Sequence, residues 1–371
     1  MKPQTVMVVA GDPSGDALAA GLVRELSAAL DSVRFIGAGG PKMAQAGVQC
    51  VFDLTADAVI GLSDAIRKLA LFRQRMRQLV RLAEEEKPEL IVLVDFSGFN
   101  RRLAHAIRAS CGRVPKIVQY VSPQVWASRP SRAEKMAEDF DLLLCLFPFE
   151  KEWYARRTPN FRVEWVGHPI FDRPLASKRM EAKAPTVLLL PGSRQGELKR
   201  HLPVVVEAAE IIQAKHPSRF VMVVPNEQMA ATARIAAGTK TVKIEIQVGG
   251  LDSALAPATI SIAKTGTTTL ECAWAGVPTV AFYKTSALTY AIGRQIVSVK
   301  YLAMPNILAD RELFPELIQN QATPIRIAEA ALALLENPAR RAEIESDLTK
   351  VIAILGGPGA TKRAASAILT L

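Results

Sequence analysis

Short apolar runs alternate along this chain with longer segments whose apolar residues recur at helical spacing. Runs without polar alternation are typical of strands in a parallel sheet that is covered on both faces. A representative helical segment spans residues 17–30, where Leu18, Leu22, Leu26 and Leu30 share one face. The predicted strands are residues 6–10, 34–37, 90–94, 116–121, 142–146, 163–166, 187–190, 220–224, 242–247, 260–263 and 279–283.

Glycine turns connect a strand to a helix at two distant places, residues 11–16 (GDPSGD) and 191–196 (PGSRQG). In the second turn, Gly192 and Gly196 would let the backbone approach a ligand closely. The helix that follows would point unpaired N–H groups at the turn, which favours an anion. Arg194 could hold a phosphate through two of its donors. The alternative is a simple strand-to-helix turn with a solvated arginine.

Two such units predict an α/β protein with two facing Rossmann-like, doubly wound domains, with ligands beyond the carboxyl ends of the strands. A length of 371 residues also favours two domains. We predict domains at residues 1–167 and 168–356, with a hinge at Gly167-His168-Pro169. Helices are expected from about residue 324 onward. Glycines at 356–359 would let the last helix, about 357–371, return to the first domain.

Composition narrows the class of partner. A net charge of +10 and a pI near 9.5 indicate acidic partners such as nucleic acid, anionic lipid or a phosphorylated substrate. The four cysteines are scattered in apolar surroundings and are predicted to be buried, reduced thiols. The four histidines form no metal-binding motif. With no signal peptide and no apolar run long enough to span a bilayer, a cytoplasmic protein is expected.

A basic amphipathic helix is predicted from Asp64 to about residue 86. It carries Ile66 and Leu69 on an apolar stripe and Arg73 and Arg77 among its basic residues. The preceding loop is itself apolar and contains Ile60 and Leu62. Such a combination can lie on an anionic membrane. The alternative is a crossover helix with a solvated basic face.

Polar residues follow several predicted strands. Asp95 stands at the carboxyl end of the strand 90–94 and is a candidate general base, although a helix N-cap is the alternative. The loop 122–128 is rich in groups that contact sugars or acyl chains. Residues 264–269 (KTGTTT) form another turn suited to phosphate at a helix start. Glu271 could accept hydrogen bonds from a ribose diol or simply favour the helix dipole. The segment 304–316 is predicted to be a long irregular loop.

In their order and separation, these residues resemble the lipid-A-disaccharide synthase family of glycosyltransferases, which has the GT-B arrangement. The resemblance covers nearly the whole chain. It rests on AGDPSGD at 10–16, GAGGPKM at 37–43, Asp95 with FN at 99–100, YVSPQVW at 120–126, FPFEK at 147–151, GHP at 167–169, LLPGSRQGE at 189–197, KTGTTTLE at 264–271, MPNILADRE at 304–312 and PELIQ at 315–319.

The resemblance implies that the enzyme joins UDP-2,3-diacylglucosamine to 2,3-diacylglucosamine 1-phosphate and releases UDP, with inversion and without a metal or other cofactor. It assigns catalytic roles to Asp95, Arg194 and Asn306. The implied substrate-binding residues are Asp12, Ser14, Gly15, Ser122, Trp126, Gly192, Ser193, Thr265, Gly266, Thr267, Thr268, Glu271 and Gln319. The N-terminal domain would take the acceptor and meet the membrane through residues 59–81, and the C-terminal domain would bind the UDP-sugar.

By the same resemblance, the enzyme would lie on the inner face of the inner membrane as a peripheral protein, with a homodimer possible. Three positions depart from the family pattern: Asp12 replaces a frequent Glu, Gly98 a frequent Asp, and Ser128 a frequent Trp. Asp12 is the alternative candidate for the base. These departures leave the acyl-chain preference open.

Other functions remain to be weighed. Two other enzymes are alternatives: a GT-B transferase that builds the peptidoglycan lipid intermediate, and a UDP-sugar epimerase. The alternative that is not an enzyme is a nucleotide-binding membrane scaffold. A dinucleotide dehydrogenase is disfavoured because neither glycine turn matches G-x-G-x-x-G. Nucleic-acid binding is disfavoured because no groove-reading motif is present.

Overall fold

The computed structural model describes residues 4–59, 65–112, 115–173 and 184–371, and its contacts divide the chain into two compact units. Unit 1 comprises Met1–Asp172 together with Leu355–Leu371, and unit 2 comprises Arg173–Ile354. The predicted hinge at 167–169 lies within unit 1, where the backbone N–H of His168 donates to the carbonyl of Leu355 at 3.1 Å.

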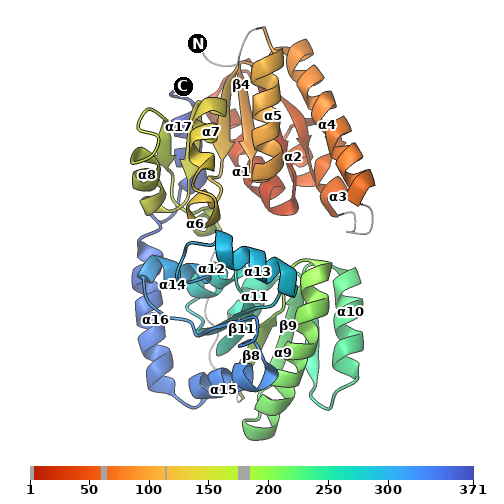
Figure 1. The fold of residues 1–371 in the computed structure, drawn as a ribbon, viewed down its shortest axis with the longest axis vertical. Coiled ribbons are helices and arrows are strands. Elements are labelled where there is room, and N and C mark those ends of the chain that lie inside the picture. Colours follow the sequence, from red (N-terminus) through yellow and green to blue (C-terminus); the bar gives the residue numbers. More distant parts are fainter. Residues whose placement is uncertain (1–3, 60–64, 113–114, 174–183) are drawn as a thin grey trace. The chain divides into compact units, whose positions relative to one another are not determined.

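Unit 1 is built on a parallel sheet (Figure 1) that has seven strands in the described residues, in the order β3-β2-β1-β4-β5-β6-β7. The strands are β1 (Thr5–Ala10), β2 (Arg34–Gly39), β3 (Gln49–Asp53), β4 (Leu90–Val94), β5 (Lys116–Tyr120), β6 (Leu142–Cys145) and β7 (Val163–Trp165). Every residue of β4 is buried, as its uniformly apolar sequence requires.

Two apolar cores cover the faces of this sheet. One contains side chains of α4 (Ala65–Glu86), α5 (Ser97–Ser110), α7 (Arg132–Asp139) and α8 (Pro148–Ala155). The other contains side chains of α1 (Pro13–Ala29), α2 (Pro41–Gln45) and α17 (Ala360–Ile368), so the last helix belongs to unit 1 as predicted. The short helices α3 (Leu54–Val59) and α6 (Val125–Ser128) and a 3-10 turn at Pro169–Asp172 complete the unit.

Unit 2 repeats the plan with six parallel strands in its described part, ordered β10-β9-β8-β11-β12-β13. They are β8 (Thr186–Leu190), β9 (Arg219–Val224), β10 (Ile244–Val248), β11 (Ile260–Lys264), β12 (Thr279–Tyr283) and β13 (Glu316–Ile318). The helices are α9 (Gln195–Lys215), α10 (Glu227–Gly238), α11 (Leu251–Leu255), α12 (Thr267–Trp274), α13 (Ala287–Ile296), α14 (Met304–Ala309), α15 (Pro324–Leu335) and α16 (Pro338–Ala353). Two parallel-sheet units confirm the predicted α/β class.

Several local predictions are wrong, and β3 (Gln49–Asp53) is absent from the predicted strands. The first helix begins at Pro13 rather than at 17, because Asp12 caps it and proline suits the first helical position. The loop 122–128 includes the short helix α6. The segment 304–316 is not one irregular loop, because it opens with α14 and leads into β13.

The cysteines are free thiols, but only Cys145 and Cys272 are buried, whereas Cys50 and Cys111 are partly exposed. Burial raises the pKa of Cys272 to about 12. No helix in the part of the chain that the structure describes is both long and apolar enough to cross a bilayer.

Candidate functional site

The strand order of unit 1 reverses between β1 and β4, which is where doubly wound sheets bind ligands. Asp95 follows β4 at this point and has a left-handed backbone, with φ of 51°, and Phe96 follows with φ of 34°. The helix N-cap of α5 is Phe96, so the alternative interpretation of Asp95 as that cap is wrong. Strained backbone at such a place is held only when its surroundings fix it.

Hydrogen bonds to the peptide groups of Asp95 provide that fixation. Its N–H donates to the carbonyl of Tyr120 at 2.7 Å. Its carbonyl accepts from the side-chain amides of Asn100, at 2.8 Å, and Gln119, at 3.0 Å. The buried strand ends thus hold the Asp95 backbone, and Asp95 as a residue is half-buried at the carboxyl edge of the sheet.

The first glycine turn packs directly against this residue. A Cβ atom added to Gly15 would lie 3.3 Å from the Cβ of Asp95 and 3.3 Å from Oδ1 of Asp12. A Cβ on Gly11 would lie 2.1 Å from the ring of Phe96. The structure therefore brings Asp12, Gly15 and Asp95 together, as adjacent parallel strands require.

Within that turn, Asp12 has a structural task. Its Oδ1 accepts from the N–H of Gly15 at 2.7 Å and so caps α1. Ser14 is exposed. Asp16 is buried and accepts from the backbone N–H groups of Gly40, Lys42 and Met43 at 2.9–3.0 Å, which anchors α2 to α1.

Ser122 and Trp126, which are predicted to bind substrate, are buried and belong to a hydrogen-bonded network. The indole Nε1 of Trp126 donates to Glu150 at 3.1 Å, and the same carboxyl accepts from the N–H of Phe147 at 3.0 Å. Ser122 Oγ lies 3.4 Å from the hydroxyl of Tyr154. Burial raises the pKa of Glu150 to about 7, although these hydrogen bonds oppose the shift.

In unit 2 the strand order reverses between β8 and β11, and both predicted phosphate turns follow these strands. Arg194 is the N-cap residue of α9, and its side chain is 81% exposed. Glu197 receives the N–H of Ser193 at 3.3 Å and pairs with Nζ of Lys264, also at 3.3 Å. A Cβ on Gly192 would lie 2.8 Å from Oε2 of Glu197, so that carboxylate fills the space that the glycine leaves.

The second turn leads into α12. Gly266 has φ of 130°, buried Thr265 donates its N–H to the carbonyl of Phe282 at 3.0 Å, and Thr267 is exposed at the helix start, followed by half-buried Thr268. Glu271 forms an ion pair with Arg173 at 2.9 Å. The first turns of α9 and α12 thus follow neighbouring strands at one edge of the sheet, beside the cations Arg194 and Lys264, and such helix starts suit a diphosphate.

Asn306 and Gln319 make their hydrogen bonds within the protein. Asn306 is fully buried, donates to the carbonyl of Phe314 and to Glu316, and accepts from two backbone N–H groups. Gln319 both donates to and accepts from the backbone of Thr285 at 3.0 Å. These contacts organise the segment that carries α14 and β13.

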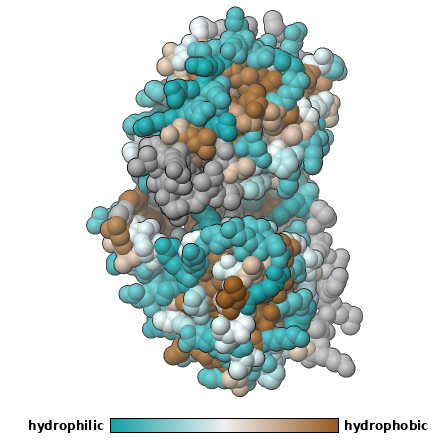
Figure 2. All heavy atoms as spheres, turned by 90° about the vertical axis from the view of Figure 1, so that its right-hand side faces the viewer, coloured by the Kyte–Doolittle hydropathy of each residue, from teal (hydrophilic) through white to brown (hydrophobic). Residues whose placement is uncertain are grey.

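For the predicted membrane face, Ile60 and Leu62 lie outside the described residues, and the side chains of Ile66 and Leu69 are not described either. Arg73 and Arg77 are exposed on α4. Two hollows have volumes of about 480 and 640 Å³. The larger of the two lies between α4 and α5 and is lined by Arg73, Met76, Arg77, Val80, Arg81, Glu84, Ala106 and Ser110. Figure 2 shows apolar groups bordered by hydrophilic ones on the α4 side of unit 1.

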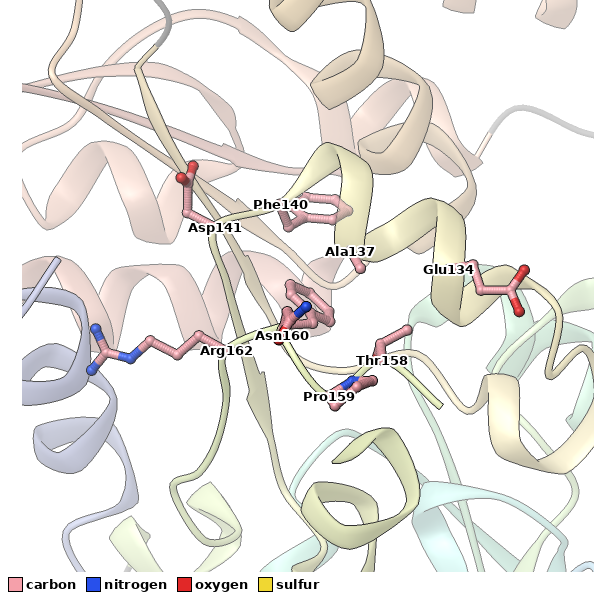
Figure 3. Close-up of a pocket in the computed structure, with 9 residues that line it drawn as sticks. Glu134, Ala137, Phe140, Asp141, Thr158, Pro159, Asn160 and Arg162 are labelled. Carbon is pink, nitrogen blue, oxygen red and sulfur yellow. The ribbon is translucent and has the colours of Figure 1, made fainter. Parts of the chain in front are cut away.

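The smaller hollow, of about 480 Å³, is shown in Figure 3 and lies elsewhere. Its lining includes Phe140 and Asp141, which precede β6, and Asn160 and Arg162, which precede β7. It is therefore at the amino ends of these strands, opposite to the edge where doubly wound sheets bind ligands.

Sequence reasoning missed two features, the pairing of Lys264 with Glu197 and the burial of Glu150. Lys264 belongs to a quoted motif, but its pairing with Glu197 depends on β8 and β11 being neighbours. The sequence offered one signal for this pair, because residues of opposite charge follow two predicted strands of the same sheet. Glu150 gave no such signal, because its burial arises from tertiary packing. Among the described residues, no three His, Cys, Asp or Glu side chains form a group that could hold a metal ion.

Comparison with known proteins agrees with this arrangement. The family model described as lipid-A-disaccharide synthetase matches residues 6–371. The chain is 36% identical to the lipid-A-disaccharide synthase of Anaeromyxobacter dehalogenans (strain 2CP-1 / ATCC BAA-258), covering 98% of this chain and 96% of the relative. It is 37% identical to that of Azotobacter vinelandii, covering 99% and 97%.

Among solved structures, the calicheamicin glycosyltransferase CalG4 is similar, with a TM-score of 0.60 and 18% identity over 100% of this chain and 99% of that one. This likeness concerns the fold, which is that of GT-B glycosyltransferases. With the family model matched over nearly its whole length, the chain belongs to the lipid-A-disaccharide synthase family and is a hexosyltransferase of lipid A biosynthesis.

Proposed function

We propose that this chain transfers the acylated glucosamine of UDP-2,3-diacylglucosamine to the 6-hydroxyl of 2,3-diacylglucosamine 1-phosphate. In one displacement, the acceptor oxygen bonds to the anomeric carbon as the bond to UDP breaks, and configuration inverts. The hydroxyl proton passes to a base, and no metal or cofactor takes part. The observation that carries the proposal is Asp95 at the strand-order reversal of unit 1.

Asp95 is the proposed base. A catalytic carboxylate must be held in a fixed direction while its oxygen stays accessible. The left-handed backbone and the hydrogen bonds from Asn100 and Gln119 supply the first condition. The half-buried position at the carboxyl edge supports the second. Asp12, the alternative base, already accepts from the N–H of Gly15 as a helix cap.

Unit 2 is the proposed donor site. The charge that develops on the departing diphosphate would be stabilised by Arg194 and by the N–H groups at the starts of α9 and α12. Lys264 offsets the charge of Glu197, so the turn remains favourable to an anion. Asn306 and Gln319 would act by holding the segment around α14 and β13, because their polar atoms are occupied by the protein.

Peripheral attachment to the cytoplasmic face of the inner membrane belongs to the same proposal. The supporting observation is the hollow between α4 and α5, where Met76 and Val80 alternate with Arg73, Arg77 and Arg81 along its lining. Apolar groups beside cations suit an anionic lipid surface. Both substrates carry acyl chains and would be drawn from that surface.

The test is incubation with both acylated substrates, followed by mass spectrometry for the disaccharide phosphate. Asp95→Asn keeps the shape but removes the base, so kcat should fall about 10²–10⁴-fold while UDP affinity by calorimetry stays near that of the wild type. Glu152→Gln is the matched control and should stay active, because it makes the same carboxylate-to-amide change at an exposed ion pair of unit 1. A chelator should leave the wild-type rate unchanged.

If Asp95→Asn keeps more than about a tenth of the rate while chemistry is limiting, Asp95 is not the base. A wild-type enzyme that isomerises the UDP-sugar without making a disaccharide would be an epimerase. One that prefers an unacylated UDP-sugar would match the transferase of the peptidoglycan lipid intermediate.

A further inference from the structure

Four arginines surround one end of the seam between α5 and α7. Arg101 and Arg102 lie on α5, Arg132 begins α7, and Arg129 is the C-cap residue of α6, three residues before Arg132. The two helices pack side by side (Figure 1) and follow β4 and β5, which are adjacent parallel strands. Both helices therefore begin at the carboxyl edge of the sheet, and this end of the seam is the end that carries Asp95.

The opposite end of the same seam is neutralised. His105 Nδ1 lies 2.9 Å from Oδ1 of Asp139, and Nη2 of Arg108 lies 2.8 Å from Oδ2 of Asp141. Arg101, His105 and Arg108 are spaced i, i+4 and i+7, so they lie on one face of α5. On this face of α5, His105 and Arg108 pair with carboxylates, whereas Arg101 lies near other arginines.

Among the described residues, none of the four arginines forms an ion pair with a carboxylate. Arg101 and Arg132 are half-buried, and Arg102 and Arg129 are exposed. Desolvation and the charges of the other three lower the pKa of Arg132. The nearest acid on α7, Glu134, forms no ion pair in the part that the structure describes. Cations gathered in this way repel one another, and an anion between them would remove that cost.

We propose that this arginine cluster (Arg101, Arg102, Arg129 and Arg132) binds the phosphomonoester of the sugar acceptor, an inference that rests on the proposed function. A phosphomonoester carries a charge of about −1.5 to −2 at neutral pH. Guanidinium groups bind its oxygens through paired donors better than ammonium groups do.

The distance from the proposed base fits this assignment. Asp95 lies two residues before the first residue of α5, and Arg101 lies about 6 Å along the helix axis from that first residue, at 1.5 Å per residue. This axial distance of about 6 Å is comparable to the width of one sugar ring. An acceptor could thus present a hydroxyl to Asp95 at one end while its phosphate reaches the cluster at the other.

The test compares two acceptors, one with the anomeric phosphate and one without it. The wild type should prefer the phosphorylated acceptor in kcat/KM. In Arg102→Gln/Arg132→Gln this preference should shrink at least tenfold, since one charged hydrogen bond is worth about 1.5–3 kcal/mol and a decade about 1.4 kcal/mol. The rate with the unphosphorylated acceptor and the KM for the donor should not change.

Arg132→Lys keeps the charge but loses the paired donors, so an intermediate preference is expected. Arg156→Gln is the matched control, because it removes the same charge from an exposed ion pair on α8 in the same unit. It should leave the preference unchanged.

A double variant that keeps the wild-type preference would overturn the inference, while formation of the disaccharide phosphate by the wild type would leave the proposed function standing. Loss of binding to phosphatidylglycerol vesicles with an unchanged preference would also overturn it, because the cluster would then serve the bilayer.

A further measurement does not depend on any variant folding. Glucosamine 1-phosphate should inhibit the wild type competitively against the acceptor, and glucosamine should inhibit it at least tenfold more weakly. Equal inhibition by the two would count against a phosphate site.

Discussion

Replacing Asn306 by alanine should open the segment between α14 and β13. The amide oxygen of Asn306 accepts from the N–H groups of Leu313 and Phe314 at 2.9 and 2.8 Å. Its amide nitrogen donates to the carbonyl of Phe314 at 2.8 Å and to Oε1 of Glu316 at 2.9 Å. No part of the residue is exposed to water that could replace these contacts.

The magnitude follows from which groups lose their only partner. Glu316 also accepts from the N–H groups of Leu302 and Ala303, so its carboxylate loses little. The N–H groups of Leu313 and Phe314 would be buried without an acceptor, at about 1–3 kcal/mol each. We therefore expect Asn306→Ala to lower the free energy of local opening by about 2–6 kcal/mol.

Hydrogen exchange of peptides covering residues 302–318 measures this local opening directly. The matched control is Asn226→Ala, which removes a single hydrogen bond of 3.0 Å at the start of α10 in the same unit. Loss of such a cap costs about 1 kcal/mol. Asn306→Ala should speed exchange in residues 302–318 more than Asn226→Ala speeds exchange in α10. An equal or smaller acceleration would show that the N–H groups of Leu313 and Phe314 do not depend on Asn306.

Three further outcomes are expected. Arg194→Ala should lower kcat/KM at least about tenfold by removing a charged hydrogen bond to the diphosphate, with thermal stability unchanged; a wild-type value would exclude that contact. The raised pKa of Glu150, about 7, means that stabilisation by its neutral form is complete below about pH 4.5 and is lost as pH rises through 7. Unfolding measured from pH 4.5 to 8 should show that wild type loses stability relative to Glu150→Gln, and parallel curves would contradict this. Arg77→Glu should weaken sedimentation with anionic vesicles at low salt, whereas Arg156→Glu on α8 should not; equal behaviour would argue against docking through α4.

The sequence predicted the class of fold well, because parallel strands buried on both faces leave uninterrupted apolar runs. β4 and β8 were found in this way. The pattern was less informative where a helix begins through capping, as at Asp12, or where one buried amide organises an irregular segment, as Asn306 does. In both places the decisive contacts join side chains to backbone groups and leave no periodic signal.

For the site, the sequence motifs follow β1, β4, β8 and β11, and the pairing of these strands explains why the motifs of each unit meet. They could not distinguish a residue that faces a ligand from one that holds its neighbours. Trp126 illustrates the limit, because its indole donates to buried Glu150. Side chains and backbone geometry, such as the left-handed conformation of Asp95, supplied the rest.

Unit 1 is made of two stretches of chain that are synthesised at different times. Asp172 accepts from the N–H groups of Gly359, Ala360 and Thr361 at 2.6–3.1 Å, and so fixes the start of α17. Unit 2 is therefore an insertion within unit 1 and is continuous in sequence.

A ribosome completes unit 2 before it delivers the helix that closes the apolar face of α1. The N-terminal unit, although begun first, would be the last to finish folding, and its α1 surface would stay exposed until α17 has been made. A truncation before Ala360 would remove α17 and leave that surface uncovered.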